Sequence, residues 1–372
     1  MIHPIWPFST DYPKLEYDTR AEVLVVGGGI AGVSCAYFLG NSGFDVALIE
    51  KDRIASSTTG SSAGTLYFGA GKGLADSIDL YGRKNAKLLW EESAETINKI
   101  ESIIENNSIR CGFKRPGAIT AAKTKEEHNV LEKERKAMKD FGYEANMLTG
   151  KEIMDHFTGK EFHSGLLEPC SLVKPGLFVT GLSRVVNARF YEGTRMKSFD
   201  ETKDGVIVKT DGGEISCDYL VGAMNTADFY GIGKHFTGVD NTMVPSKPLG
   251  SRLKELWPGD KVIWTMGDDY DLFYCQDDRT LLEVYNPAKI GQKTSEYFPG
   301  IEFDRKSIFW GEWARTEDWL PMAGKLSDRV FCSAAMGDQG LIMGFTCGRK
   351  MPELLKGEKD PFLDMVSPRR FK

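Results

Sequence analysis

The sequence has few of the residues that build metal sites and disulfide frameworks. Its 372 residues include seven cysteines and five histidines, and no two cysteines form a CxxC pair. The histidines show no HExxH or other metal-ligand spacing. We therefore predict no metal site and no disulfide framework, and we interpret the cysteines as reduced thiols of a cytoplasmic protein.

Long apolar runs and an excess of positive charge are also missing. No run approaches the ~18 apolar residues that a membrane-spanning helix needs. The first twenty residues lack the basic and apolar regions of a signal peptide. We expect no membrane span. The 53 acidic residues outnumber the 47 basic ones, giving a net charge of −6, which argues against a nucleic-acid partner.

A glycine-rich stretch near the N-terminus carries the first positive signal, AEVLVVGGGIAGVSCAYFLGNSGFDVALIEKD at 21–52. Residues 22–26 form an apolar, β-branched run that is typical of a buried parallel strand. The spacing after the glycines predicts a helix that Gly43 would end. Residues 45–49 predict a second strand, and Glu50 closes it.

The glycines of the GxGxxG pattern have separate expected tasks. Gly27 permits a tight turn between strand and helix, Gly29 lets the backbone approach a pyrophosphate, and Gly32 lets the helix pack close to the strand. The helix N-terminus offers free N–H groups to phosphates. Glu50 lies 18 residues after Gly32, where an acidic residue accepts hydrogen bonds from a ribose. These features predict dinucleotide binding, but they do not separate FAD from NAD.

The loop after Glu50 is rich in small residues, with SSTTGSSAG at 56–64. Such a loop suits close contact with a cofactor through hydroxyl groups and backbone amides, and the alternative is a flexible linker. Amphipathic spacing predicts helices over 77–106 and 125–141. A helix is expected over 175–189, because Pro175 suits its first turn.

Two groups of strands are expected in the rest of the chain. A hairpin over 206–217, followed by a buried strand over 218–223, would extend the first sheet. Several short strand-like runs predict a second, mostly antiparallel sheet. These runs are 113–122, 261–266, 272–275 and 281–285.

With these motifs the sequence resembles the FAD-dependent oxidoreductases of the D-amino-acid oxidase, glycine oxidase and sarcosine oxidase type. The resemblance covers nearly the whole chain and favours FAD, because a single GxGxxG leaves no separate nicotinamide domain. It rests on VVGGGIAG with Glu50, the SSTTGSSAG loop, DYLVGAMN, VPSKPL at 244–249 and RTEDWLPMAG…VFCSAAMGDQGLIMG at 315–344.

The resemblance implies an α/β fold in which a Rossmann-like FAD-binding domain is interleaved with an antiparallel-sheet substrate domain. We assign residues 20–110, 160–230 and 325–372 to the FAD-binding domain. We assign residues 111–159 and 231–324 to the substrate domain.

The resemblance also implies which residues contact FAD. The glycine-rich loop would bind the pyrophosphate, Glu50 the adenosine ribose, and 195–197 the adenine. Residues 57–64 would pass the pyrophosphate and the isoalloxazine ring. Residues 337–341, at a helix N-terminus, would face the flavin pyrimidine and stabilise its negative charge on reduction. The expected contacts are Gly27, Gly29, Ile30, Ala31, Gly32, Glu50, Lys51, Ser57, Thr58, Thr59, Ser62, Ala63, Gly64, Met196, Asn225, Gly337, Asp338, Gln339, Gly340 and Leu341.

In amino-acid-oxidising members, an arginine before a D…P segment clamps the substrate carboxylate through bidentate pairing. Here Arg315 precedes Asp318 with a spacing two residues shorter than usual, and Trp313 stands at the usual position. We predict Arg315 as a displaced clamp, and the alternative is a structural ion pair with Glu312 or Glu317.

Two further features bear on the substrate. Lys247 of VPSKPL is a candidate cation near the flavin, although an ordinary exposed lysine is the alternative. Aromatic residues are frequent in the second-sheet region, and we expect some of them to line the substrate cavity. They are Trp264, Tyr270, Phe273, Tyr274, Tyr285, Trp310, Trp313 and Trp319.

These features predict an enzyme that oxidises a small amine or amino acid at a C–N bond. Hydride would pass to flavin N5, the imine would hydrolyse, and oxygen or another carrier would accept the electrons. One alternative is a dehydrogenase of 2-hydroxy acids or polyol phosphates. Another is a flavoprotein subunit of an electron-transferring complex.

Overall fold

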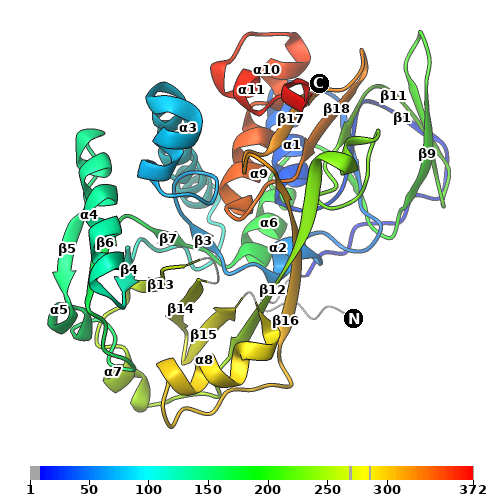
Figure 1. Ribbon diagram of the computed structural model, residues 1–372. Coiled ribbons are helices and arrows are strands. Elements are labelled where there is room, and N and C mark those ends of the chain that lie inside the picture. Colours follow the sequence, from blue (N-terminus) through cyan, green and yellow to red (C-terminus); the bar gives the residue numbers. More distant parts are fainter. Residues whose placement is uncertain (1–8, 268–269, 285, 372) are drawn as a thin grey trace.

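The computed structural model describes residues 9–267, 270–284 and 286–371, so Tyr285 lies outside the described residues. Figure 1 shows two large sheets, one in the upper part of the view with the C-terminal helices and one below it. This arrangement confirms the expected fold class. Within the described ranges, no helix is long and apolar enough to cross a membrane.

The first sheet has a parallel centre in the order β8-β2-β1-β11-β18. Val26 of β1 lies opposite both Ile49 of β2 and Gly222 of β11. The carboxyl ends of these strands therefore meet at one edge. The eight strands are β1 (Thr19–Val26), β2 (Val46–Ile49), β8 (Arg189–Tyr191), β9 (Met196–Glu201), β10 (Val206–Thr210), β11 (Glu214–Gly222), β17 (Met322–Lys325) and β18 (Val330–Ala334).

Helices cover this sheet, and α1 (Ile30–Asn41) packs closely on α9 (Gly340–Arg349). The contact needs a glycine, because a Cβ at Gly348 would lie 2.5 Å from the Ser34 side chain. Gly43 has a φ of +91° just after the helix cap, as the sequence predicts. The other helices near this sheet are α2 (Thr58–Ser61), α3 (Leu74–Asn106), α6 (Pro175–Arg184), α10 (Met351–Lys356), α11 (Pro361–Val366), η1 (Ile232–His235) and η3 (Pro368–Phe371).

The second sheet has the order β16-β12-β15-β14-β13-β4-β6-β5. All its pairs are antiparallel except β13 with β4. Its strands are β4 (Ala118–Ala122), β5 (Asn146–Thr149), β6 (Ser164–Glu168), β12 (Phe236–Pro245), β13 (Val262–Thr265), β14 (Asp271–Gln276), β15 (Arg279–Val284) and β16 (Phe309–Thr316). The remaining elements are β3 (Thr65–Leu66), β7 (Ser171–Leu172), α4 (Lys125–Asp140), α5 (Gly150–Met154), α7 (Arg252–Leu256), α8 (Ile290–Tyr297) and η2 (Pro287–Lys289).

Two details differ from the sequence-based expectations. The helix expected over 175–189 ends at Arg184, because Arg189–Tyr191 instead pairs with β2 as the edge strand β8. Strand β6 pairs within the second sheet, although residues 160–230 were assigned to the FAD-binding domain. The domain boundaries themselves remain a prediction.

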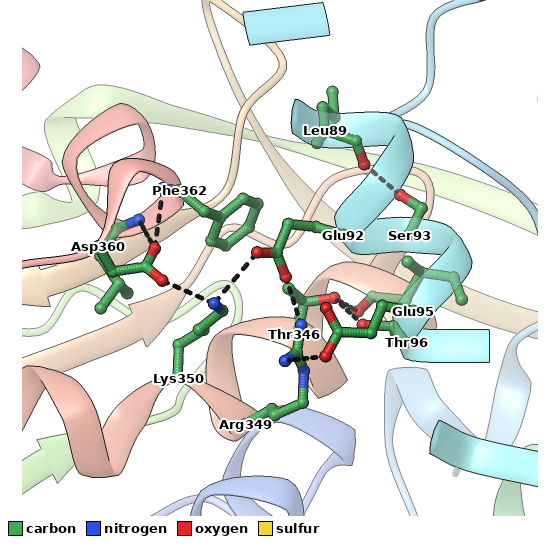
Figure 2. Close-up of polar contacts among 12 residues, drawn as sticks. Leu89, Glu92, Ser93, Glu95, Thr96, Thr346, Arg349, Lys350, Asp360 and Phe362 are labelled. Carbon is green, nitrogen blue, oxygen red and sulfur yellow. Dashed lines mark hydrogen bonds and ion pairs between the residues drawn. The ribbon is translucent and has the colours of Figure 1, made fainter. Parts of the chain in front are cut away.

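A buried ion network ties the C-terminal helices to α3, as Figure 2 shows. The Lys350 ammonium lies 2.6 Å from an Asp360 carboxylate oxygen and 3.1 Å from a Glu92 oxygen. Arg349 pairs with both Glu92 and Glu95. Burial opposes the charge on Lys350, but its bonds to Asp360 and Glu92 raise its pKa. The network thus fixes α9 and α10 against α3.

Candidate active site

A cavity of about 520 Å³ lies where the carboxyl edge of the first sheet faces the second sheet. The first sheet contributes the glycine-rich loop, the segment from Glu50, and residues 194–197 and 223–228. The opposite end of the cavity is called its inner end here. It is lined by residues on or beside the second sheet and by residues 336–341 before and at the start of α9. The residues from the second-sheet side are Asn241, Trp264, Tyr270, Glu283 and Trp313.

The glycine-rich loop has a shape that only glycine permits at two positions. Gly27 has a φ of +114°, and a Cβ there would lie 2.5 Å from the carbonyl oxygen of Ala223. A Cβ at Gly32 would lie 1.9 Å from the carbonyl oxygen of Gly27. Gly32 therefore packs α1 against the loop and does not line the cavity, which fits its expected task.

Glu50 is positioned at the cavity by the end of β2. The Gly28 N–H donates to one Glu50 carboxylate oxygen at 2.7 Å, and the Asp52 N–H donates to the other at 2.9 Å. The carboxylate therefore stands beside the glycine-rich loop. Helix α1 begins after Gly29, which has no side chain to cap it. The Ile30 N–H donates to Thr59, and Ala31, the next residue of the first turn, lines the cavity, so its backbone N–H is placed to meet an anion.

The small-residue loop forms the short helix α2 and is held between the two sheets. The Thr59 hydroxyl accepts a hydrogen bond from the Ile30 N–H at 3.0 Å. The Thr58 hydroxyl donates to the Glu312 carbonyl at 2.6 Å, and the Tyr274 hydroxyl donates to the Ala63 carbonyl at 2.5 Å. These contacts tie the loop to α1 and to the second sheet, which is not the geometry of a flexible linker.

The cavity lining fits a dinucleotide. The glycines leave room at a helix N-terminus, and the Glu50 carboxylate lies beside them. Three buried polar atoms of lining residues also have no hydrogen-bond partner within the described residues. Because buried polar atoms need partners, a polar ligand is expected beside them. These atoms are Ser61 Oγ, Trp264 Nε1 and Gln339 Oε1.

The inner end of the cavity combines carboxylates with aromatic rings. The Tyr270 hydroxyl donates to an Asp338 carboxylate oxygen at 2.5 Å. The Asn241 amide donates to Glu283. Burial raises the pKa of Glu283 to about 8, the nearby Asp338 adds to this shift, and the bond from Asn241 opposes it. The rings of Tyr270 and Trp264 lie 5.4 Å apart.

Nearly all the residues that the sequence analysis assigned to FAD line this cavity. The exceptions are Gly32 and Gly64. A Cβ at Gly64 would lie 2.1 Å from the Val173 carbonyl oxygen, so Gly64 packs against the segment before α6.

The two predicted substrate residues are not brought into the cavity. The Arg315 guanidinium lies 4.3 Å from the centre of the Trp319 ring, and Arg315 is absent from the lining. Neither Glu312 nor Glu317 forms an ion pair with it among the described residues. Lys247 is exposed and lies 2.6 Å from Glu302. Both cations therefore stand outside the cavity wall.

The aromatic residues named from the sequence divide between several roles. Trp264, Tyr270 and Trp313 line the cavity. Phe273 and Tyr274 are core residues, and Trp310 is exposed. The sequence analysis missed Asn241 and Glu283. A signal for Glu283 is present, because a single carboxylate interrupts the apolar run of β15, and a buried charge needs a specific reason.

The chain matches the family model described as FAD dependent oxidoreductase over residues 22–354. It is 24% identical to a probable oxidoreductase OrdL of Haemophilus influenzae, over 94% of this chain and 86% of that protein. It is 24% identical to the gamma-glutamylputrescine oxidoreductase of Escherichia coli, over 96% of this chain and 87% of that protein.

Solved structures share the fold. The glycine oxidase of Geobacillus kaustophilus superimposes with a TM-score of 0.78 at 19% identity, covering 94% of this chain and 98% of that one. The L-proline dehydrogenase of P. horikoshii gives 0.76 at 18% identity, covering 96% and 98%. The resemblance predicted from the motifs is thus confirmed, and with it the cofactor. This chain is an enzyme that uses FAD, and it belongs to the FAD-dependent oxidoreductase family.

Proposed function

We propose that this enzyme oxidises a small amine or amino acid at a C–N bond. The observation that carries the proposal is the inner end of the cavity, where aromatic rings and carboxylates converge at the start of α9. Similar proteins are named for such substrates, namely a gamma-glutamylputrescine oxidoreductase, a glycine oxidase and an iminodiacetate oxidase. When bound, FAD supplies the hydride acceptor, flavin N5, for the carbon that bears the nitrogen.

The proposal gives distinct FAD-binding roles to the nucleotide end, which is the end of the cavity beside the glycine-rich loop and Glu50, and to the start of α9. The glycine-rich loop and the first turn of α1 would hold the pyrophosphate, since free N–H groups favour anions. Glu50 would accept hydrogen bonds from the adenosine ribose. Residues 195–197 would border the adenine, and residues 337–341 would border the flavin pyrimidine, where the N-terminus of α9 stabilises negative charge.

At the inner end, the chain would orient the substrate and exclude water. Trp264, Tyr270 and Trp313 provide rigid, largely apolar walls. The hydrogen bond from Tyr270 to Asp338 fixes the direction of that carboxylate. Oxidation removes a hydride and a proton from the substrate, and water then converts the imine to a carbonyl compound and a free amine or ammonia.

We predict that amines reduce the flavin of the holoenzyme in the absence of oxygen. The measurement is the rate of bleaching of the visible flavin band with a panel of amines, amino acids, N-methylglycines, 2-hydroxy acids and polyol phosphates. Amines or amino acids should bleach the band within seconds of mixing. The 2-hydroxy acids and polyol phosphates should not, because they have no amine nitrogen that could donate to the acceptors at the inner end.

Bleaching by 2-hydroxy acids or polyol phosphates alone would contradict the proposal. That result would favour the alternative function, a dehydrogenase of 2-hydroxy acids or polyol phosphates. Flavin that no member of the panel reduces would contradict it as well, and would favour a flavoprotein subunit that needs a partner. The Glu302→Gln variant serves as a control, because Glu302 is exposed and pairs with Lys247 outside the cavity.

A further inference from the structure

We infer that the substrate is a cationic amine whose protonated nitrogen binds between Glu283 and Asp338, and that the substrate needs no carboxylate group. This inference deepens the proposed function and rests on it. It concerns the inner end of the same cavity, which the sequence analysis expected to be served by the cations Arg315 and Lys247.

The charges on the cavity wall are separated along its length. All its described cations belong to the nucleotide end, two after Glu50 and two at the start of β9. They are Lys51, Arg53, Arg195 and Lys197. At the inner end, the described lining residues include no lysine, arginine or histidine, but two carboxylates, Glu283 and Asp338. A cationic ligand complements this end, and an anionic one does not.

Several hydrogen-bond acceptors face the inner end, beside the Nε1 donor of Trp264, which has no partner among the described residues. Asp338 accepts from the Tyr270 hydroxyl at 2.5 Å and from the Gln339 amide at 3.1 Å. Glu283 accepts from Asn241. Gln339 is only 5% exposed, and its Oε1 has no hydrogen-bond partner within the described chain. A protonated amine carries up to three N–H donors, so it can donate to the Gln339 Oε1 and to the Asp338 carboxylate at the same time.

The position of the expected carboxylate clamp supports the same conclusion. Trp313 occupies the place that the family resemblance gives to an arginine, and its side chain lines the cavity. Arg315, two residues on, stacks on Trp319 instead. A substrate carboxylate at the inner end would therefore meet an indole, the Glu283 carboxyl group and the Asp338 carboxylate, with no cation among the described lining residues of that end to pair with it.

The environment of Glu283 shows what a bound cation would relieve. Glu283 is buried in β15, and burial together with Asp338 raises its pKa to about 8. Asn241 of β12 is its hydrogen-bond partner, and the Tyr274 phenol of β14 also lies within reach of its charge. A cation between Glu283 and Asp338 stabilises both carboxylates in their charged form.

The test uses two ligands of the same shape that cannot be oxidised. Neither tert-butylammonium nor pivalate has a hydrogen on the carbon beside its charged group, so both report binding alone. Each is titrated into the holoenzyme, and the change in the flavin absorption spectrum gives the Kd. We expect tert-butylammonium to bind at least about tenfold more tightly than pivalate, as expected for a hydrogen bond to a charged group.

Variants locate the binding site. Glu283→Gln and Asp338→Asn keep the shape of each side chain and remove its charge. Each should weaken tert-butylammonium binding by about 10- to 100-fold, since each loses a charged hydrogen bond. Glu302→Gln, the same change at an exposed position, should leave the Kd as it is. An unchanged flavin spectrum of each variant before any ligand is added shows that the variant is folded around FAD.

The outcomes separate this inference from the proposed function. Tighter binding of pivalate, or a Kd for tert-butylammonium that neither variant changes, overturns the inference. If amino acids with free carboxylates still bleach the flavin fastest in that case, oxidation at a C–N bond stands and only the cationic site fails. Bleaching by 2-hydroxy acids alone overturns both.

Discussion

Gly32→Ala is expected to abolish stable FAD binding. The added Cβ would lie 1.9 Å from the carbonyl oxygen of Gly27, which is backbone and cannot rotate away. Either α1 or the glycine-rich loop must then move, and both lie at the site of the pyrophosphate. Overpacking of this kind costs at least a few kcal/mol, so FAD affinity should fall by about 100-fold or more.

The measurement is the FAD content of the purified variant and its affinity on reconstitution. Gly142→Ala is the control. Gly142 has a positive φ, +83°, which Gly32 in helix α1 does not have, and a Cβ at Gly142 would meet nothing within 4 Å. This control adds backbone strain outside the loop and no clash, and it should retain FAD. A Gly32→Ala protein that binds FAD as tightly as the parent chain would contradict the role assigned to the loop.

Lys350→Ala is expected to lower the free energy of unfolding by about 3–5 kcal/mol, since it removes the cation that two largely buried carboxylates share and leaves one of them with Arg349 alone. Those carboxylates belong to Glu92 and Asp360, which lie on either side of the ammonium (Figure 2). Asp360 also caps α11 by accepting from the Phe362 and Leu363 N–H groups. Loss of the cation should therefore loosen α3, α10 and α11 together.

Denaturant unfolding of the holoenzyme measures this effect. Lys356→Ala makes the same change at an exposed position at the end of α10, the helix that begins just after Lys350, and it should alter the free energy of unfolding by less than about 0.5 kcal/mol. A similar small loss for Lys350→Ala would show that the network contributes little to stability. The visible flavin spectrum of both variants shows whether the start of α9 has moved.

The nucleotide end of the site could be predicted from the sequence because its geometry is local. The turn at Gly27, the helix that follows and the Glu50 carboxylate all lie within one strand-helix-strand unit. Backbone sterics and the position of an acidic residue are enough to define such a unit. The expected strand over 218–223 joined it as the end of β11, beside β1.

The substrate end could not be predicted in the same way. Asn241 and Glu283 come from different strands of the second sheet, and β12 and β15 are neighbours only in the folded sheet. Strand periodicity placed Trp313 and Arg315 on one face, but it could not show that Arg315 stacks on Trp319. The end of the helix at Arg184 likewise depends on the pairing of β8 with β2, which is a tertiary contact.

A single turnover tests oxidation at a C–N bond most directly. The holoenzyme is mixed without oxygen with the amine that bleaches its flavin fastest, labelled with nitrogen-15, and the products are measured against the flavin reduced. The account predicts one carbonyl compound and one labelled ammonia or amine for each flavin. Reduced flavin together with a product that is oxidised at a carbon not bonded to the labelled nitrogen would contradict it.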